Sequence, residues 1–213
     1  MLSALHKSPL GRVAADLIVK YQNAIVPADS PKNKSPSDIA FNIVRALTLY
    51  SLAEFQSGHA STIKIAAEGR SFSVADNGRG HSIDRMVDGI SYLDLVYKHF
   101  DYPFGTAHGT TVQLQGIGMS LINSLCSELV VAVQKPEKAL RLTFRDGSSV
   151  SSELLMIDHA EAGIAISGTV KSELQISPVD SSQIRNWLVD LLAANTSLNL
   201  LFNGQILSTP ADT

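Results

Sequence analysis

The sequence predicts an α+β fold, a two-layer sandwich in which helices back one face of a mixed β-sheet. Runs with the alternation of strands are grouped in the second half of the chain, whereas segments with helical periodicity lie mostly elsewhere. With 213 residues and 45% apolar composition, the chain can bury one sizeable core. We expect residues 1–36 to form a helix and linker that belong to the same structural unit as a domain of residues 37–213.

Two helices are expected before the first strand. The first covers Leu10–Ala24 and is followed by a loop with three prolines, Pro27–Ser37. The second is capped by Ser37 or Asp38 and ends at Gly58, because glycine commonly follows the last helical turn. Its apolar residues recur at helical spacing: Ile39, Ile43, Leu47, Tyr50 and Phe55.

A β-hairpin is expected next. The alternating runs Thr62–Glu68 and Ser71–Ala75 are joined by Gly69–Arg70, which favours a tight turn. The sequence DNGRG follows at Asp76–Gly80, and the spacing of apolar residues then predicts a helix over Asp84–Phe100.

The second half is expected to be rich in strands. Residues 101–115, with one proline and two glycines, form a connection to a helix over Gly116–Ser127, on whose apolar face Cys126 is a small buried side chain. Trp187 is expected to pack in the core. The remaining elements are strands at Leu129–Gln134, Ala139–Phe144, Val150–Ile157 and Ile164–Ile176, a helix at Ser181–Ala193, and strands at Leu198–Phe202 and Ile206–Leu207 around an Asn-Gly turn.

Composition excludes several classes of function. A net charge of -3 and an aromatic content of 6% argue against direct nucleic-acid binding. A single cysteine, Cys126, excludes an internal disulfide and a multi-cysteine zinc site, and the six histidines lack paired ligand spacing. No apolar run is long enough to span a membrane, and no signal peptide is recognised, so the cytoplasm is the expected location.

Three short motifs carry candidate chemistry. Asp76 ends a strand, and a carboxylate at a strand end can accept a hydrogen bond from the exocyclic amine of adenine. Gly78 and Gly80 follow it, and glycines allow the backbone to pass close to a flat ring. A common Asp-Asn-Gly turn is the alternative. Gly116 and Gly118 open a helix whose free amide groups attract phosphate. Thr169 lies in Ser-Gly-Thr-Val, and a threonine hydroxyl that faces a pocket can share a hydrogen bond with the acid and the base, although threonine is also routine in strands.

Together, DNGRG, then GIGMSLINSL, then SGTV resemble the ATP-binding domain of the GHKL family (gyrase, Hsp90 and histidine-kinase-like ATPases), of the gyrase B and topoisomerase IV type. The stretch Glu54–His59 is similar to the acid-x-x-x-Gly-His ending of that family's long helix. The resemblance runs from about Ile39 to Gln205 and implies the Bergerat fold of this family.

The resemblance also implies a set of nucleotide-binding residues and a lid over ATP at Asp84–Gln115. Those matched are the adenine acid Asp76, the pocket glycines Gly78 and Gly80, Arg79 at the pocket mouth, the phosphate-facing Gly116 and Gly118, and Thr169 as the support of the acid.

The chain departs from the family where catalysis takes place. The family's long helix carries a glutamate that polarises water and, four residues later, an asparagine that binds magnesium; these positions are Ala46 and Tyr50 here. Alanine has no basic atom, and a neutral tyrosine is a poor magnesium ligand. The glycines and histidine of the family's lid are replaced as well, by Val112, Gln113 and Gln115.

These residues predict an adenine-nucleotide-binding domain that binds ATP or ADP, with magnesium left open, and that hydrolyses ATP weakly or not at all. A protein partner or a second copy is expected in addition to the nucleotide. The alternatives are an active ATPase that uses Glu54, Asp38 or Asn42, a catalytic domain of the histidine-kinase type, and a nucleotide-free interaction module.

Overall fold

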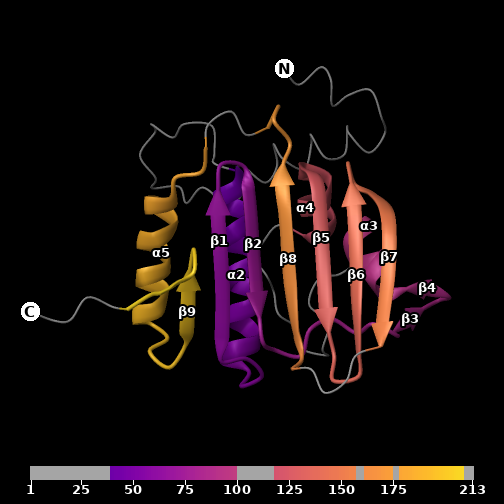
Figure 1. Cartoon of the computed structure of the whole chain (residues 1–213), viewed down its shortest axis with the longest axis horizontal. Helices are drawn as coiled ribbons and strands as arrows, with labels where there is room; N and C mark the ends of the chain where they lie inside the picture. The colour runs from indigo at the N-terminus through magenta and orange to yellow at the C-terminus, as the bar shows by residue number, and fades with distance from the viewer. Residues whose placement is uncertain (1–38, 100–117, 157–160, 175–177, 209–213) are drawn as a thin grey trace, which may run out of the picture.

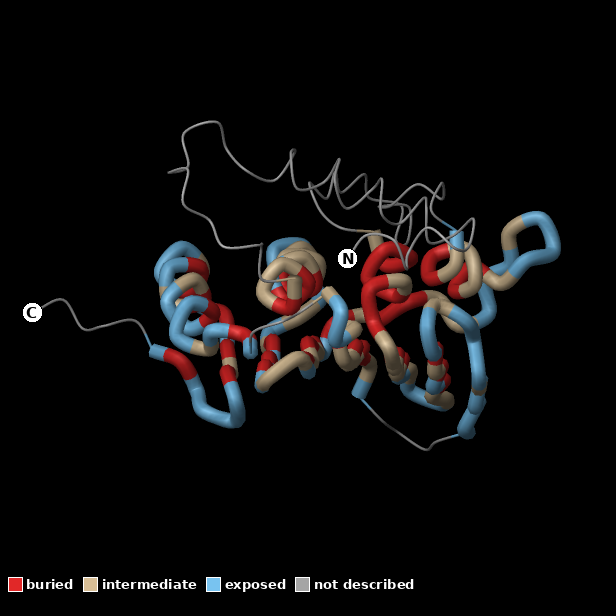
Figure 2. The backbone as a smooth tube through the Cα atoms, turned by 90° about the horizontal axis from the view of Figure 1, so that it is seen from above, coloured by how far each residue is buried: buried red, intermediate tan, exposed pale blue. Residues whose placement is uncertain are grey.

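A computed structural model describes residues 39–99, 118–156, 161–174 and 178–208. These residues form an eight-stranded sheet with helices on one face only (Figures 1 and 2). The predicted α+β sandwich is therefore confirmed. The described residues do not include the expected helix at Leu10–Ala24, the loop and cap before residue 39, or residues 100–115, the second half of the predicted lid.

The sheet is mixed, in the order β10-β9-β1-β2-β8-β5-β6-β7 (Figure 1). All its neighbours are antiparallel except β1 and β9, which run parallel. The strands are β1 (Thr62–Glu68), β2 (Ser71–Asp76), β5 (Cys126–Gln134), β6 (Lys138–Arg145), β7 (Ser148–Met156), β8 (Gly163–Val170), β9 (Asn199–Phe202) and β10 (Gln205–Ile206).

The first helix of the described chain, α2 (Ile39–Gln56), packs against β1 and β2. It ends as predicted, because Gly58 follows it with a φ of 75°, a left-handed conformation that glycine adopts without strain. The predicted hairpin of β1 and β2 is also confirmed, and Ile63 and Ile65 point from it into the core beneath α2.

The segment after Gly80 differs from the prediction. Instead of one helix over Asp84–Phe100, a small hairpin of β3 (Met86–Val87) and β4 (Ile90–Ser91) precedes a short helix, α3 (Tyr92–Lys98). Asp88 and Gly89 both have positive φ, which is the conformation that a two-residue hairpin turn requires. This Asp-Gly pair overrides the helical spacing of the neighbouring apolar residues.

Two boundaries in the second half also differ. The helix α4 (Met119–Leu125) ends early, and Cys126 is the first residue of β5 rather than part of a helical face; its side chain is buried, as expected. Strand β8 ends at Val170, short of the predicted Ile176. The last helix, α5 (Ser181–Ala193), has its predicted bounds and is capped by the carboxylate of Asp180, which accepts from the amides of Ser182 and Gln183.

The core lies between the sheet and its helices, where the buried residues of Figure 2 are concentrated. The ring of Trp187 on α5 packs edge-on against Phe41 on α2, with centroids 6.2 Å apart, so Trp187 contributes to core packing as predicted. Within the described ranges, none of the helices is both long and apolar enough to cross a membrane.

Candidate functional site

The carboxylate of Asp76 lies where β2 ends and faces α2. Its Oδ2 accepts a hydrogen bond of 2.6 Å from the hydroxyl of Ser51, and its Oδ1 accepts one of 2.9 Å from the amide of Gly78. The residue is only 7% exposed. A helix residue and the turn after the strand therefore fix both oxygens of a buried acid.

Burial raises the pKa of Asp76, because the charged form loses its hydration. The hydrogen bonds from Ser51 and Gly78 oppose this effect, and the nearby carboxylate of Glu54 adds to it. The acid is thus a strong acceptor for a donor that reaches it, because few competing water molecules surround it.

The two glycines after Asp76 are required by close contacts. A Cβ on Gly78 would lie 2.8 Å from Asp76 Oδ1, and a Cβ on Gly80 would lie 2.6 Å from the backbone oxygen of Gly163 on β8. Gly80 also has a φ of 62°. The turn that follows Asp76 therefore passes too close to its neighbours for any larger residue at these positions.

Arg79 is held by Glu54 rather than left free at the turn. The carboxylate of Glu54 accepts hydrogen bonds from the Nε, Nη2 and backbone amide of Arg79, at 3.1, 2.8 and 3.3 Å. Lys135, from the turn between β5 and β6, donates to the backbone oxygens of Arg79 and Gly80, and its burial lowers the pKa of its ammonium group. Two charged side chains from other elements thus anchor the turn at Arg79 and Gly80.

The side chain of Tyr50 is largely buried beside the acid site, where it lies within hydrogen-bond distance of His81. Its hydroxyl lies 3.2 Å from Nδ1 of His81, whose Nε2 lies 3.1 Å from the hydroxyl of Tyr97 on α3. His81 is 1% exposed, and burial raises the pKa of the Tyr50 hydroxyl. Ala46 lies one turn before Tyr50 on α2 and is half-buried. A neutral, hydrogen-bonded tyrosine therefore fills the space beside Ala46.

One predicted contact is wrong. Thr169 lies opposite Ser71 at the start of β2, with the two hydroxyls 3.1 Å apart, so it does not contact Asp76 at the other end of that strand. The residue opposite Asp76 on β8 is Ile164, which has no hydroxyl. The hydroxyl that supports the acid comes from Ser51 instead.

The predicted phosphate-facing glycines are only partly described. Gly116 lies outside the described residues, whereas Gly118 is the N-cap residue of α4, with extended backbone. Helix α4 is linked to the site through Asn123, whose side-chain amide donates to the backbone oxygen of Tyr97.

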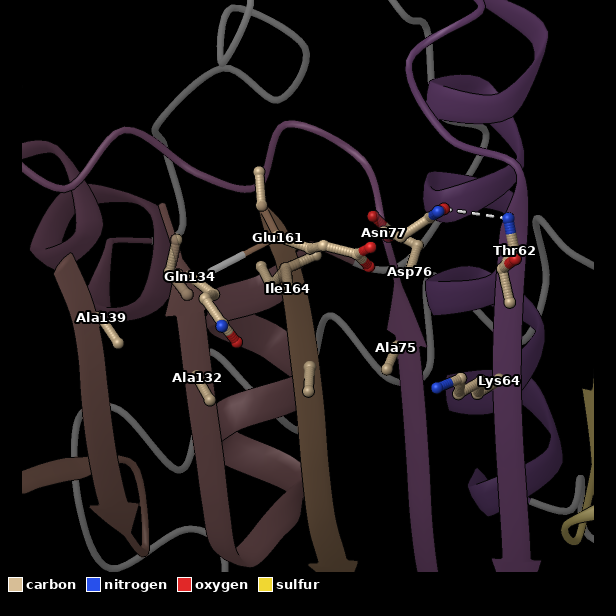
Figure 3. A pocket seen from close by; sticks show the side chains of 14 residues that line it. Thr62, Lys64, Ala75, Asp76, Asn77, Ala132, Gln134, Ala139, Glu161 and Ile164 are labelled. Carbon is tan, nitrogen blue, oxygen red and sulfur yellow. Dashed lines mark hydrogen bonds between the residues drawn. The ribbon is translucent and has the colours of Figure 1, made fainter. Parts of the chain in front are cut away.

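A cavity of about 410 Å³ lies on the open face of the sheet, away from the helices (Figure 3). Its floor is formed by small residues of neighbouring strands, including Ala75, Ala132 and Ala165. Asp76 also lines this cavity, but its carboxylate turns toward α2, as the hydrogen bond from Ser51 requires. The cavity is therefore a separate feature from the acid site.

Sequence reasoning missed Ser51 and His81. A signal for Ser51 was present, since Leu47, Ser51 and Glu54 share one face of α2 by helical spacing, and polar residues on a buried face need partners. His81 carries no comparable signal, because its tyrosine partners come from two separate helices.

Comparison with known proteins gives consistent matches. No family model matches the sequence. The chain is 30% identical over 113 residues to the B subunit of DNA topoisomerase 4 from Mycoplasma pneumoniae, a match that covers 51% of this chain and 18% of that protein. It is 32% identical over 106 residues to the B subunit of DNA gyrase from Borreliella burgdorferi, covering 48% and 17%. The chain thus spans less than a fifth of the length of these relatives.

The fold matches a solved structure over most of its length. The topoisomerase IV ATP-binding domain of Francisella tularensis, solved with a small-molecule inhibitor, superposes with a TM-score of 0.64 at 19% sequence identity. The match covers 90% of this chain and 92% of that domain.

Proposed function

We propose that this chain is an ATP-binding domain of the GHKL family, of the gyrase B and topoisomerase IV type. In this proposal it binds an adenine nucleotide at Asp76 and hydrolyses ATP slowly or not at all. The observation that carries the proposal is the buried carboxylate of Asp76, oriented by Ser51 and Gly78. The match to an ATP-binding domain over 90% of the chain supports the same location.

The chemistry of the acid suits adenine. An ionised carboxylate only accepts hydrogen bonds, and the exocyclic amine of adenine only donates them. Guanine presents a carbonyl oxygen at the equivalent position and would be repelled. The close-packed turn at Gly78 and Gly80 adds a wall of backbone beside which a flat ring can lie.

The helix that would supply the catalytic groups does not fit magnesium or a general base. Ala46 has no donor atom, and the hydroxyl of Tyr50 is neutral and lies within hydrogen-bond distance of His81. Among the described residues, no group of three or more His, Cys, Asp or Glu side chains is arranged to hold a metal ion. Loss of a general base alone lowers a rate by about 10²–10⁴.

Glu54 does not replace the missing base. Its carboxylate is 6% exposed and binds Arg79 through three hydrogen bonds. A general base must direct an oxygen at the attacking water, whereas both carboxylate oxygens of Glu54 accept hydrogen bonds from Arg79. This arrangement favours impaired hydrolysis over an active ATPase that uses Glu54.

Calorimetric titration of the whole chain with ATP, ADP and adenosine, each with and without magnesium, tests the proposal. We expect the three ligands to bind with similar affinity and ATP to gain little from magnesium, because Tyr50 stands where the resemblance predicts the magnesium ligand. Undetectable binding at millimolar ligand would reject the nucleotide and favour an interaction module in which Tyr50 and His81 fill the site.

The matched variants are Asp76→Asn and Asp190→Asn. Both remove one negative charge, but Asp190 is an exposed residue of α5 and lies outside the predicted lid. We expect Asp76→Asn to abolish binding and Asp190→Asn to leave it unchanged. Phosphate release from ATP in the wild type that disappears in Asp76→Asn would show an active ATPase instead.

A further inference from the structure

Two Asn-Gly pairs occur in the chain, Asn77–Gly78 and Asn203–Gly204, and each directly follows a strand, β2 and β9 respectively. An asparagine that precedes glycine is prone to lose its side-chain nitrogen as ammonia, because glycine has no side chain to hinder attack by its own amide nitrogen. Both asparagines are exposed, so exposure does not distinguish the two pairs. The hydrogen bonds around the attacking nitrogen do.

The amide nitrogen of Gly78 is protected by Asp76. It donates a hydrogen bond of 2.9 Å to Oδ1 of Asp76, in a buried position. To attack a carbonyl carbon, this nitrogen must first lose its proton. The carboxylate stabilises the N–H group as a donor and repels the negative charge that loss of the proton would leave.

The side chain of Asn77 is fixed as well. Its Oδ1 accepts hydrogen bonds of 2.9 Å from the amides of Ser61 and Thr62, and its Nδ2 donates one of 3.0 Å to the hydroxyl of Ser61 (Figure 3 shows the bond to Thr62). These bonds hold the side-chain amide at the start of β1. It is therefore not free to rotate into the orientation that attack by Gly78 requires.

The surroundings of Gly204 are open. Within the described ranges, the amide of Gly204 donates to no acceptor. A Cβ on Gly204 would meet nothing within 4 Å, whereas one on Gly78 would lie 2.8 Å from Oδ1 of Asp76. The amide nitrogen of Gly204 is thus accessible both to water and to the side chain of Asn203.

The side chain of Asn203 is held only by Ala67 of β1. Its Oδ1 accepts a hydrogen bond of 3.0 Å from the amide of Ala67, and its Nδ2 donates a long one of 3.5 Å to the oxygen of Ala67. The turn leads to β10, which has two residues and pairs with β9 alone in the part of the sheet that the structure describes. Opening this turn breaks few contacts, and such edges open at a lower free energy than the core does.

We propose that Asn203 deamidates spontaneously in the folded protein, whereas the fold protects Asn77. The amide nitrogen of Gly204 loses its proton to solvent and forms a bond to Cγ of Asn203, which closes a succinimide ring. The side-chain nitrogen takes up a proton and leaves as ammonia. Water then adds to either carbonyl carbon of the ring and breaks the bond of that carbon to nitrogen, which gives aspartate or isoaspartate.

Deamidation weakens the contact between this turn and β1. The oxygen of Ala67 accepts from Nδ2 of Asn203, and in the aspartate product it would face a carboxylate oxygen instead. Two acceptors repel each other, and the oxygen of Ala67 loses a donor. Isoaspartate also lengthens the backbone, so the pairing of Phe202 with Gln205 across the turn is disturbed.

Peptide mass spectrometry after incubation of the whole chain in mildly alkaline buffer, below its unfolding temperature, measures both sites at once. We expect the peptide that carries Asn203 to react about tenfold faster than the one that carries Asn77, or more, because an edge turn opens at lower free energy than a buried one. In water enriched in ¹⁸O the product should gain one labelled oxygen. Part of the product should be isoaspartate, which resists a protease that cleaves before aspartate.

The same chain in urea is the control for the effect of the sequence alone. Unfolding removes the hydrogen bonds that protect Asn77, so the two pairs should then react at similar rates. Three results would each overturn the proposal: equal rates in the folded protein, a faster reaction at Asn77, and a reaction at Asn203 that requires urea.

Two variants separate the chemistry from its consequence. Asn203→Gln keeps an amide but has to close a larger ring, so it should not deamidate at this position. Asn203→Asp gives the aspartate product directly and should unfold at a lower temperature than the wild type, toward which the wild type should move as it ages. An Asn203→Asp variant as stable as the wild type would contradict the effect on Ala67.

Discussion

At the scale of single residues, the ionisation of Asp76 depends on two opposing effects: burial raises its pKa, and hydrogen bonds from Ser51 and Gly78 lower it. Burial raises its pKa, so on acidification Asp76 takes up a proton at a higher pH than an exposed aspartate does. In the proposed function the ionised carboxylate is the stronger acceptor for the adenine amine. We therefore expect nucleotide affinity to fall with decreasing pH before ordinary aspartates are protonated, which titration at a series of pH values measures.

Ser51→Ala extends this prediction. The serine hydroxyl lowers the pKa of Asp76 by stabilising its charge, so its removal should move the loss of affinity to higher pH. Ser51→Thr, which keeps a hydroxyl, should restore the wild-type profile. Equal profiles for the wild type and Ser51→Ala would show that the hydroxyl does not control the ionisation of Asp76.

The raised pKa of Asp76 also affects the stability of the fold, in the opposite direction to its effect on nucleotide affinity. Because the folded pKa is raised, the native state binds more protons than the unfolded chain between the ordinary aspartate pKa and the raised one. The contribution of Asp76 to stability therefore falls as pH rises through that window. In Asp76→Asn this part of the pH dependence should vanish from urea unfolding curves.

The pair of Glu54 and Arg79 predicts unequal mutant effects. Arg79→Ala leaves a buried carboxylate without its guanidinium and should cost about 1–3 kcal/mol of unfolding free energy. Glu54→Gln retains an oxygen acceptor and leaves Arg79, whose side chain is partly exposed, in contact with water, so its cost should be smaller. Urea unfolding followed by the fluorescence of Trp187 measures both, and a larger cost for Glu54→Gln would contradict this order.

At the scale of secondary-structure elements, α2 decides which chemistry the site supports. It supplies Ser51 and Glu54 to the acid site, whereas Ala46 and Tyr50 stand at the positions that the sequence resemblance predicts for the family's catalytic pair. We expect Ala46→Glu with Tyr50→Asn to make ATP binding depend on magnesium and to start phosphate release. The exchange also leaves His81 without the Tyr50 hydroxyl, so a lower unfolding temperature should accompany it.

The contact between Gly163 at the start of β8 and the backbone of Asp76 leaves no room for a larger side chain. A Cβ on Gly163 would lie 2.5 Å from the backbone oxygen of Asp76. Gly163→Ala should therefore displace the acid, weaken nucleotide binding and cost about 1–3 kcal/mol of stability. Ala165→Ser, on the open face of the same strand, is the control and should leave both quantities near their wild-type values.

Periodicity predicts the elements whose own sequence determines them. The hairpin of β1 and β2 follows from alternation around Gly69–Arg70, and α5 from its helical spacing, so both lie where expected. Over residues 84–91 apolar spacing predicts a helix, but the Asp88–Gly89 turn decides the structure. The motif predicts Thr169 as the support of Asp76. This prediction is wrong, because a motif carries no information on the register between β2 and β8.

At the scale of the whole molecule, the fold is predictable because the order of helices and strands leaves few ways to cover one sheet. Asp76, Gly78 and Gly80 can be predicted from the sequence because they lie within one five-residue motif. Ser51 and Lys135 are harder to predict, because they reach the turn from α2 and from the turn between β5 and β6, although the helical spacing of α2 gives a signal for Ser51. His81 directly follows Gly80, but its tyrosine partners lie on α2 and α3. Neighbourhoods of this kind arise only when the chain folds.

The parallel pairing of β1 with β9 has a consequence for synthesis. Thr62 and its neighbour Asn199 are 137 residues apart, so at about 5–20 residues per second the ribosome adds β9 roughly 7–27 s after β1. Until then the nascent hairpin exposes an unpaired backbone to other chains. A product truncated before β9 would keep that vulnerability permanently, which makes it a candidate for chaperone capture and proteolysis.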